Sequence, residues 1–373
     1  MDNDAKDVNE AIQKVMNAEA WNEFCDLLKK AGNVIVRDDL ETSAFDRGEG
    51  MRYLGRLLRA GLTSFSENTG PEYPRFRAMP EMVKMGLDNP DNYYLSTGVN
   101  PQLRYKIRGN RGSIHYMSFA AQNQNFAAKD KITGGAGHLN DAEIETDANG
   151  DFEIIASQKE EPGNWLRMTP DTKQILLRQT FLHRDRETPV EVAVECLDSE
   201  GPPPPLDPER VQSSLMGSAM YAIGCAQWFA DWVVDFRNHA PVNEFHLPDE
   251  EQHRLVGGDP NIRIWLGFWK LAPDEALVIE ATPPNCHYWN FQLGNIWAES
   301  LDYKFRQVHI NNGSAVLRDD GSFRLVVAHE DPGPGVDNWM DTAGHDHGTM
   351  CVRWVRADDY PEPRCRVVKR SDL

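Results

Sequence analysis

The pentapeptide HYMSF at residues 115–119 returns as HYWNF at residues 287–291, and this pair decides how the fold is interpreted. Three further pairs follow in the same order: GDFEII (150–155) and GSFRLV (321–326), Asn-Trp (164–165) and Asn-Trp (338–339), and Arg178 and Arg353. The members of every pair are separated by 171 to 175 residues. Self-similarity at one long period is typical of a structural unit that is used twice. The sequence therefore predicts an internal duplication.

Both copies consist of short segments with strand-like composition, separated by clusters of Gly, Asn, Asp and Pro. Many short strands with frequent turns are typical of β-sandwiches and jelly rolls. The N-terminal region instead has apolar stripes at helical spacing, as does the uncharged stretch at residues 211–230. We therefore expect a mainly β protein with helical additions: two tandem, internally duplicated β-sandwich or jelly-roll domains, an N-terminal helical segment and a buried helix between the domains.

Four consecutive prolines at residues 202–205 cannot lie within a helix or a central strand, so they mark a linker. The chain is expected to divide into four parts: an N-terminal helical segment (1–92), a first β-sandwich domain (93–205), a linker with the buried helix (206–255) and a second β-sandwich or jelly-roll domain (256–373). Polar residues interrupt the uncharged helix and Asp231 follows it, so we do not expect it to span a membrane.

The chain has 373 residues, with 58 acidic and 39 basic side chains and a formal net charge of −19. Nucleic acids and anionic membranes are bound by concentrated Lys and Arg, so neither is an expected partner. A small-molecule ligand is expected instead. The six cysteines form no Cys-x-x-Cys motif, and residues 1–10 lack the basic and apolar regions of a signal peptide. These features indicate a cytoplasmic protein.

Two blocks of the second half resemble a known family. One is YWNFQL (288–293) followed by ESLDY (299–303), and the other is NWMDTAGH (338–345) followed by Arg353. On these blocks, the second half resembles the DUF1214 family, which consists largely of bacterial proteins of unknown function. The first β region is similar to the related DUF1254 domain. The resemblance implies a jelly-roll-like C-terminal domain, and it brings no activity, cofactor or catalytic residue.

The two copies can be compared with each other, because a feature present in both is expected to belong to the scaffold. The Asn-Trp pair occurs in both copies, and a turn-forming Asn beside a large ring can maintain the shape of a loop. Arg178 and Arg353 also recur. Such an arginine can brace a sheet, or its planar guanidinium can bind the carboxylate of a ligand. Both interpretations stay open for Arg353.

Residues 341–348 have no counterpart in the first copy, which makes them a candidate site. They place a carboxylate, Asp341, and an imidazole, His345, in a loop of small residues. Histidine changes its charge near neutral pH, so these two side chains suit general acid–base catalysis. Glu299 is the third candidate catalytic residue. The alternative interpretation is an ordinary polar surface loop.

The strand-like residues 289–293 and the segment after them supply candidate ligand contacts. Side chains alternate between the two faces of a strand, and a face of amides flanked by aromatic rings is typical of a small-molecule pocket. We therefore expect a pocket in the second half. The expected substrate-binding residues are Asn290, Asn295, Trp297, Tyr303 and Arg353.

A metal site is an alternative use of the same loop. On a strand, His345 and His347 would lie on one face and could begin such a site. Further ligands would have to come from other residues of the second half: His287, Glu299, His309 or His329. None of these has a diagnostic spacing. We expect no organic cofactor, and metal binding stays an open alternative.

Taken together, the sequence favours a cytoplasmic enzyme that uses side-chain acid–base chemistry, as a lyase, hydrolase or isomerase, on a small and partly apolar molecule. The alternative is a non-catalytic protein that binds carbohydrate or another small ligand, since β-sandwiches commonly present amides and aromatic rings to sugars. A third interpretation makes the second half an assembly surface of a homo-oligomer.

Overall fold

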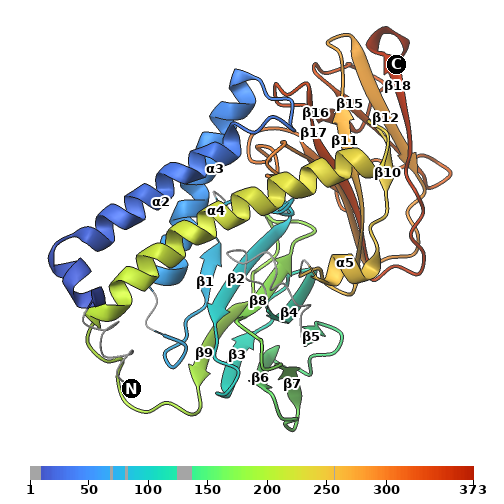
Figure 1. The fold of residues 1–373 in the computed structure, drawn as a ribbon. Coiled ribbons are helices and arrows are strands. Elements are labelled where there is room, and N and C mark those ends of the chain that lie inside the picture. Colours follow the sequence, from blue (N-terminus) through green and yellow to red (C-terminus); the bar gives the residue numbers. More distant parts are fainter. Residues whose placement is uncertain (1–9, 68–69, 80–82, 124–136, 256) are drawn as a thin grey trace.

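The computed structural model describes residues 10–67, 70–79, 83–123, 137–255 and 257–373. Two groups of β-sheets, one in each half of the chain, lie beside a layer of long helices (Figure 1). Residues 1–9, on which the expected absence of a signal peptide partly depends, lie outside the described residues. The fold class is confirmed: the protein is mainly β with helical additions.

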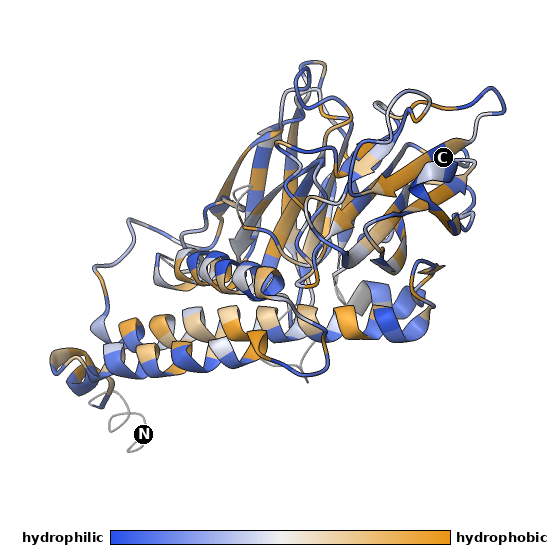
Figure 2. Cartoon of the chain, turned by 90° about the horizontal axis from the view of Figure 1, so that it is seen from above, coloured by the Kyte–Doolittle hydropathy of each residue, from blue (hydrophilic) through white to orange (hydrophobic). Residues whose placement is uncertain are grey.

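The helical layer is built from helices α2 (Glu19–Ile35), α3 (Ala44–Gly61) and α4 (Pro208–His239), with a short π-helical turn η1 (Leu62–Ser66) after α3. Ser43 and Asp46 form a reciprocal capping box that begins α3. Helix α4 begins with Asp207 as N-cap and Pro208 in its first turn. Figure 2 shows these helices as a layer on one side of the sheets.

The first half contains nine strands. They are β1 (Arg77–Met79), β2 (Asn92–Gly98), β3 (Tyr105–Asn110), β4 (Tyr116–Gln122), β5 (His138–Asn140), β6 (Asp151–Ser157), β7 (Asn164–Arg167), β8 (Gln174–Thr180) and β9 (Glu191–Cys196). One sheet has the order β1-β2-β8-β4-β5, and the other has the order β7-β6-β3-β9. All neighbours are antiparallel except β6 and β7.

The second half repeats this arrangement. Its strands are β10 (Phe245–His246), β11 (Ile262–Lys270), β12 (Glu275–Ala281), β13 (Tyr288–Gly294), β14 (His309–Asn311), β15 (Phe323–Ala328), β16 (Trp339–Asp341), β17 (His347–Val355) and β18 (Arg364–Lys369), with helix α5 (Glu250–Leu255) after β10 and a 3-10 turn η3 (Arg370–Asp372) at the end. The sheet orders are β10-β11-β17-β13-β14 and β16-β15-β12-β18. Adding nine to each strand number of the first half gives these orders, and the parallel pair, β15 and β16, is again the equivalent one.

Each half has its own core between its two sheets. In the first half, Ile107 of β3 and Phe119 of β4 belong to one buried cluster, and in the second half Ile279 of β12 and Phe291 of β13 occupy the equivalent places. The alternation of side chains along a strand sends the intervening residues to the outer faces. A third buried cluster joins α3 and α4 to the outer face of the sheet β10-β11-β17-β13-β14, through residues such as Leu266 of β11.

The structure places two boundaries differently from the sequence-based prediction. Strand β1 lies before residue 93 and pairs with β2, so the first sheet already begins at Arg77. Strand β10 lies within the predicted linker and pairs with β11 at the edge of the second sheet. Short edge strands carry little periodic signal, which explains why the sequence did not reveal β1 and β10.

Helix α4 buries its alanine-rich face, including Ala222 and Ala226, whereas Met220 on another face is 43% exposed.

The recurring Asn-Trp pair has the same contacts in both halves. The side chain of Asn338 accepts from Val316 N at 2.8 Å and donates to Val316 O at 2.8 Å and to Arg324 O at 3.1 Å. Asn164 makes the equivalent three bonds, to both backbone groups of Glu145 and to Glu153 O. These bonds tie the parallel strand to its neighbouring loop. The equivalent hydrogen bonds of Asn164 and Asn338 agree with the interpretation of the Asn-Trp pair as scaffold.

This equivalence generates a matched prediction. Asn338→Ala removes three bonds at a site that is 4% exposed, and we expect the free energy of unfolding to fall by about 2–3 kcal/mol, near 1 kcal/mol for each bond. Asn164 is half-buried, so water can replace its bonds and Asn164→Ala should destabilise less. Urea denaturation of both variants tests the difference. Equal losses, or a loss below about 0.5 kcal/mol for Asn338→Ala, would contradict the prediction.

Candidate functional site

The two halves meet through their duplicated motif. His115 and His287, the first residues of HYMSF and HYWNF, stack with their ring centres 4.2 Å apart. The Nε2 of His115 donates to the carbonyl of His287 at 2.8 Å, and the Nε2 of His287 donates to the carbonyl of His115 at 2.9 Å. Equivalent residues that bind each other reciprocally define a local two-fold relation between the halves.

Each half also buries a carboxylate of the other half. Asp259, just before β11, accepts from Tyr116 Oη at 2.9 Å and Ser118 Oγ at 2.7 Å, and His138 Nε2 lies 3.0 Å from its second oxygen. Burial alone would raise the pKa of Asp259, but these neighbours and the charge of Arg178 hold that pKa well below its usual value. The carboxylate is therefore a fixed negative charge between the halves.

Asp91, just before β2, has the corresponding position in the other direction. It accepts from Tyr288 Oη at 2.6 Å and Asn311 Nδ2 at 2.9 Å, and His309 Nε2 lies 3.1 Å away. Burial opposes its charge, and His309 and Tyr288 outweigh that effect and lower its pKa. The two carboxylates thus hold the halves together through equivalent strands.

The recurring arginines complete this contact. Arg178 Nη2 donates to the carbonyl of Gly257 at 2.6 Å, and Arg353 Nη2 donates to the carbonyl of Leu87. Arg353 Nη1 also donates to Gln292 Oε1 at 2.5 Å. Two of the predicted substrate-binding residues, Arg353 and Asn290, therefore lie in the contact between the halves, because Asn290 Nδ2 donates to Asn89 Oδ1 at 3.0 Å.

A second polar cluster brings other predicted residues together beneath helix α3. Asn295 and Glu299 lie in the turn that follows β13, and Asn295 Nδ2 donates to Glu299 Oε2 at 2.9 Å and to Glu49 Oε2 of α3 at 3.0 Å. One amide thus joins two carboxylates. Glu299 is 1% exposed, and its other oxygen accepts from Arg56 Nη1 at 2.5 Å.

His345 joins this cluster through Glu49. Its Nε2 lies 2.8 Å from Glu49 Oε2, and its Nδ1 donates to the carbonyl of Thr342 at 2.9 Å. The ring is 4% exposed and packs edge-on against Phe45, at 4.8 Å between ring centres. Arg52 binds the outer oxygen of Glu49 at 2.7 Å and is the exposed member of the cluster.

The cluster shifts the pKa values of its acidic groups in opposite directions. Burial opposes the charge of Glu49, but the hydrogen bond and charge of His345 outweigh it and lower the pKa of Glu49. Burial and the nearby charge of Glu49 raise the pKa of Glu299, in spite of Arg56. Burial also opposes the charge of His345, and Glu49 outweighs it and raises that pKa. Glu49 and His345 therefore form an ion pair beside a more easily protonated carboxyl group.

The remaining predicted residues lie elsewhere or play other parts. Trp297 is fully buried under α3, donates to the carbonyl of Asp46 at 2.8 Å, and lies so close to Gly50 that a side chain there would collide with it. Asp341 pairs with Arg306 at 2.7 Å. Tyr303 is half-buried, and the ammonium group of Lys84 lies over its ring at 4.6 Å. Asp341 and His345 are thus not brought together as an acid–base pair by any hydrogen bond found in the described chain.

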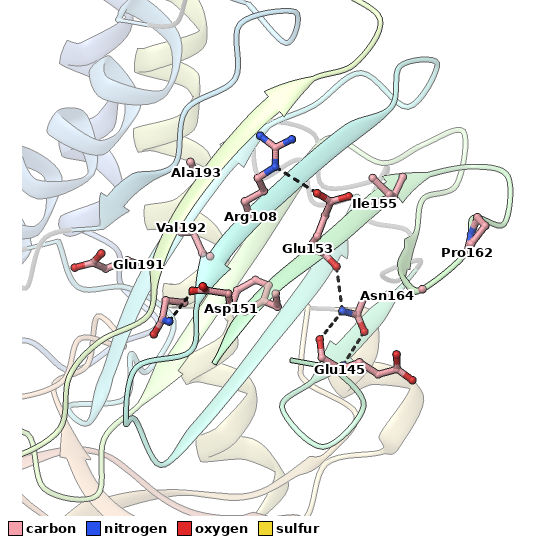
Figure 3. Close-up of a pocket in the computed structure, with 14 residues that line it drawn as sticks. Arg108, Glu145, Asp151, Glu153, Ile155, Pro162, Asn164, Glu191, Val192 and Ala193 are labelled. Carbon is pink, nitrogen blue, oxygen red and sulfur yellow. Dashed lines mark hydrogen bonds and ion pairs between the residues drawn. The ribbon is translucent and has the colours of Figure 1, made fainter. Parts of the chain in front are cut away.

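Two surface hollows lie away from these residues. One, of about 890 Å³, lies on the outer face of the first half over β3, β6 and β9, with Arg108, Glu153 and Asn164 in its wall (Figure 3). The other, of about 560 Å³, lies between residues 244–245 and residues 361–365. No predicted site residue lines either hollow, so neither is the pocket expected in the second half.

Among the residues that the structure describes, no group of three or more His, Cys, Asp or Glu side chains is arranged to hold a metal ion. His345 and His347 face different partners, Glu49 and Asp346 respectively. No helix in the described parts of the chain is long and apolar enough to cross a membrane.

Sequence reasoning missed the contribution of α3. Glu49, Arg52 and Arg56 are spaced by three and four residues, which places them along one side of a helix, beside the buried Gly50 and Tyr53. Charged residues at this spacing usually face solvent. Nothing in the sequence showed that this side meets a turn about 245 residues later in the chain.

Comparisons with known proteins agree with the second-half resemblance. The DUF1214 model, described as a protein of unknown function, matches residues 274–359. An uncharacterized protein from Burkholderia cenocepacia is 40% identical, with a TM-score of 0.92 over 97% of this chain and 100% of that chain. A protein from Vibrio parahaemolyticus is 13% identical, with a TM-score of 0.49 over 85% of this chain and 97% of that chain. None of the curated proteins matches the chain.

The Glu49–His345 pair predicts a pH-dependent effect on stability. The pKa of His345 is raised above 6.5, so its contribution is complete below that pH and is lost as the pH rises through the folded-state pKa. The pKa of Glu49 is lowered below 4.5, so its contribution is present above that pH and is lost as the pH falls through the folded-state pKa. His345→Gln should therefore destabilise most between pH 4.5 and 6.5, by about 2 kcal/mol.

Denaturant titrations at several pH values measure this effect. The same substitution at the exposed His239 is the control and should change stability little at any pH. A loss in His345→Gln that stays constant from pH 5 to pH 9 would show that the ion pair does not stabilise the fold.

Proposed function

This chain belongs to the DUF1214 family of proteins of unknown function, and we propose that it is an enzyme that uses side-chain acid–base chemistry on a small, partly apolar molecule. The observation that carries the proposal is the pair of carboxyl groups, Glu49 and Glu299, joined by the amide of Asn295. Neighbouring carboxyl groups with pKa values shifted apart are the usual means of having an acid and a base in one site. The site proposed here is this pair.

Each member of the cluster has a role in the proposal. Glu49 is the proton acceptor, and the hydrogen bond from His345 keeps it ionised. Glu299 is the proton donor, since burial favours its protonated form. In an isomerase or a lyase, the substrate loses one proton to Glu49, and the product or leaving group gains one from Glu299. In a hydrolase, water loses the proton to Glu49 and the leaving group gains one from Glu299. Proton exchange with solvent then returns both carboxyl groups to their starting states.

Asn295 and Arg56 act as positioning residues for the two carboxyl groups. The substrate approaches from the side of Arg52, whose side chain is 56% exposed whereas Glu299 is 1% exposed. Asp341 and Arg353 have no part in this chemistry, because each is bound to a structural partner. The proposed chemistry uses no organic cofactor. The proposed location is the cytoplasm of a bacterium. A homo-oligomer is the proposed assembly if the second half is an assembly surface.

The hollow of the first half supports a second candidate function, non-catalytic binding of a carbohydrate or another small polar ligand. Its wall combines amide and charged groups such as Asn164, Arg108 and Asp151 (Figure 3). Its aromatic residue, Phe152, is 5% exposed, so it offers little surface for stacking on a sugar ring. This weakness ranks the second candidate below the first.

The acid–base proposal is tested with a panel of small esters, lactones, hydroxy acids and enolisable ketones, with turnover followed by mass spectrometry. For any compound that the native protein converts, Glu299→Gln and Glu49→Gln should each lower the rate by about 10²–10⁴-fold, because each removes one proton transfer. The rate should also fall at low pH, where Glu49 is protonated, and at high pH, where Glu299 is ionised.

Glu41→Gln is the matched control, since Glu41 is exposed and pairs with Lys270, away from the cluster. It should leave the rate unchanged. A compound that both cluster variants convert at the native rate would overturn the assignment of the site, and so would a native protein that converts none of the panel.

A further inference from the structure

Strands β9 and β18 are the equivalent edge strands of the two halves. In the part of the chain that the structure describes, β9 pairs only with β3 and β18 pairs only with β12. The other side of each strand therefore presents backbone N–H and C=O groups without a neighbouring strand, which is the usual template for pairing with another chain. The two strands lie in different halves, far apart in Figure 1, so they do not meet within one copy.

The backbone pairing shows which groups face the free side of β9. Leu197 N, directly after this strand, donates to Arg104 O, and every second residue of an antiparallel strand bonds in the same direction. The N–H and C=O groups of Val192 and Val194 therefore face away from β3.

The same alternation applies to β18. Arg370 N, directly after this strand, donates to Asp274 O. The backbone groups of Cys365 and Val367 therefore face away from β12. Each edge strand thus directs backbone donors and acceptors to its free side.

The side chains of the two edges carry opposite charges. Strand β9 presents exposed carboxylates at Glu191 and Glu195, whereas β18 presents exposed basic groups at Arg364, Arg366 and Lys369. Like charges directly opposite each other destabilise a strand pair, and opposite charges stabilise it. Two β9 edges or two β18 edges should therefore repel each other, and a β9 edge should attract a β18 edge.

The ion pairs that these groups make within their own half leave them accessible. Glu195 Oε1 lies 3.2 Å from Arg108 Nη2, and the side chain of Glu195 is 51% exposed. Arg366 Nε lies 3.8 Å from Glu280 Oε2, and the side chain of Arg366 is 54% exposed. Exposed ion pairs contribute little to the stability of a fold. Both side chains can therefore turn to a neighbouring copy with little loss of stability.

Backbone direction and charge together favour one register between two copies. When Val194 is directly opposite Val367 of the other copy, the backbone groups that face the free sides meet. This register sets three further pairs opposite each other: Glu191 and Arg370, Ala193 and Val368, and Glu195 and Arg366. A shift by two residues in either direction leaves at most one pair of opposite charges.

We propose that β9 of one copy of this chain pairs with β18 of a second copy, so that the four-stranded sheets of the two copies continue as one sheet. Each copy contributes a different edge, so the contact runs head to tail and produces an open chain or a closed ring. A contact of two strand edges is small, and we expect weak, reversible association. The proposal identifies the contact of a homo-oligomer and does not depend on the acid–base function of Glu49 and Glu299.

Sedimentation velocity of the full chain over a range of concentrations tests this contact. The native chain should form oligomers that grow with concentration, and high ionic strength should dissociate them because it screens exposed charges. Glu191→Arg with Glu195→Arg makes both edges basic, and Arg366→Glu with Arg370→Glu makes both edges acidic. Each double variant alone should have an association constant lower by about tenfold or more, because like charges then face each other. An equimolar mixture of the two should associate again.

Glu160→Arg with Asp171→Arg is the matched control. Both side chains are exposed and lie in the loops on either side of β7, at the opposite edge of the sheet from β9. The control changes the net charge by as much as the β9 variant does, and it should associate as the native chain does. Equal weakening in the control and the β9 variant would show that net charge, and not this contact, governs association.

A disulfide crosslink tests the register, also if a charge-reversed variant fails to fold. Residues 193 and 368 would face each other where the strands exchange no hydrogen bond, which is where opposite side chains lie closest. Ala193→Cys mixed with Val368→Cys should give a dimer under mild oxidation, with a peptide that joins these two positions in mass spectrometry. Glu160→Cys mixed with Val368→Cys should not. A native chain that stays monomeric at every concentration, a mixture of the reversed variants that stays dissociated, or no crosslink between positions 193 and 368 would overturn the proposal.

Discussion

The arrangement of the two halves depends on the burial of two carboxylates, Asp91 and Asp259, each placed by one half among hydroxyl, amide and imidazole groups of the other. A buried charge is tolerated only when hydrogen bonds and nearby charges satisfy it. Sliding the halves apart would remove the partners that each half supplies to the carboxylate and to the arginine Nη2 of the other. Apolar contact alone would allow many docking angles, whereas this polar contact allows one.

The sheets of the two halves are covered by different segments of the chain. Each sheet has an inner face that contributes to the core of its half and an outer face that must be covered or solvated. Helices α3 and α4 cover the outer face of the second half, and their approach needs Gly50 against Trp297. In the first half, the loop at residues 257–261 lies against the equivalent sheet, where it accepts from Arg178 and Ser118.

The sequence was informative where the signal is local or repeated. The matching motifs predicted the duplication, and the recurrence of Asn164 and Asn338 correctly indicated a shared structural role, since their bonds are equivalent. The partners of Glu299 could not be predicted, because Glu49 and Arg56 come from a helix far away in the chain and look like ordinary surface charges there. Asp341 and His345 are close in sequence, yet they face Arg306 and Glu49 instead of each other.

Equivalent residues of the two halves can have different neighbours. Nη2 of Arg178 and Nη2 of Arg353 each donate to a backbone carbonyl of the other half, which agrees with the interpretation of these arginines as braces and not as ligand contacts. The difference between the copies lies in the neighbours, Ala120 in one and Gln292 in the other. Leaving a buried donor unpaired costs about 1–3 kcal/mol, a loss that the closed network of the second half does not have. Equivalent arginines are therefore held in the same way through Nη2, while Nη1 is paired in the second half and has no partner among the described residues in the first.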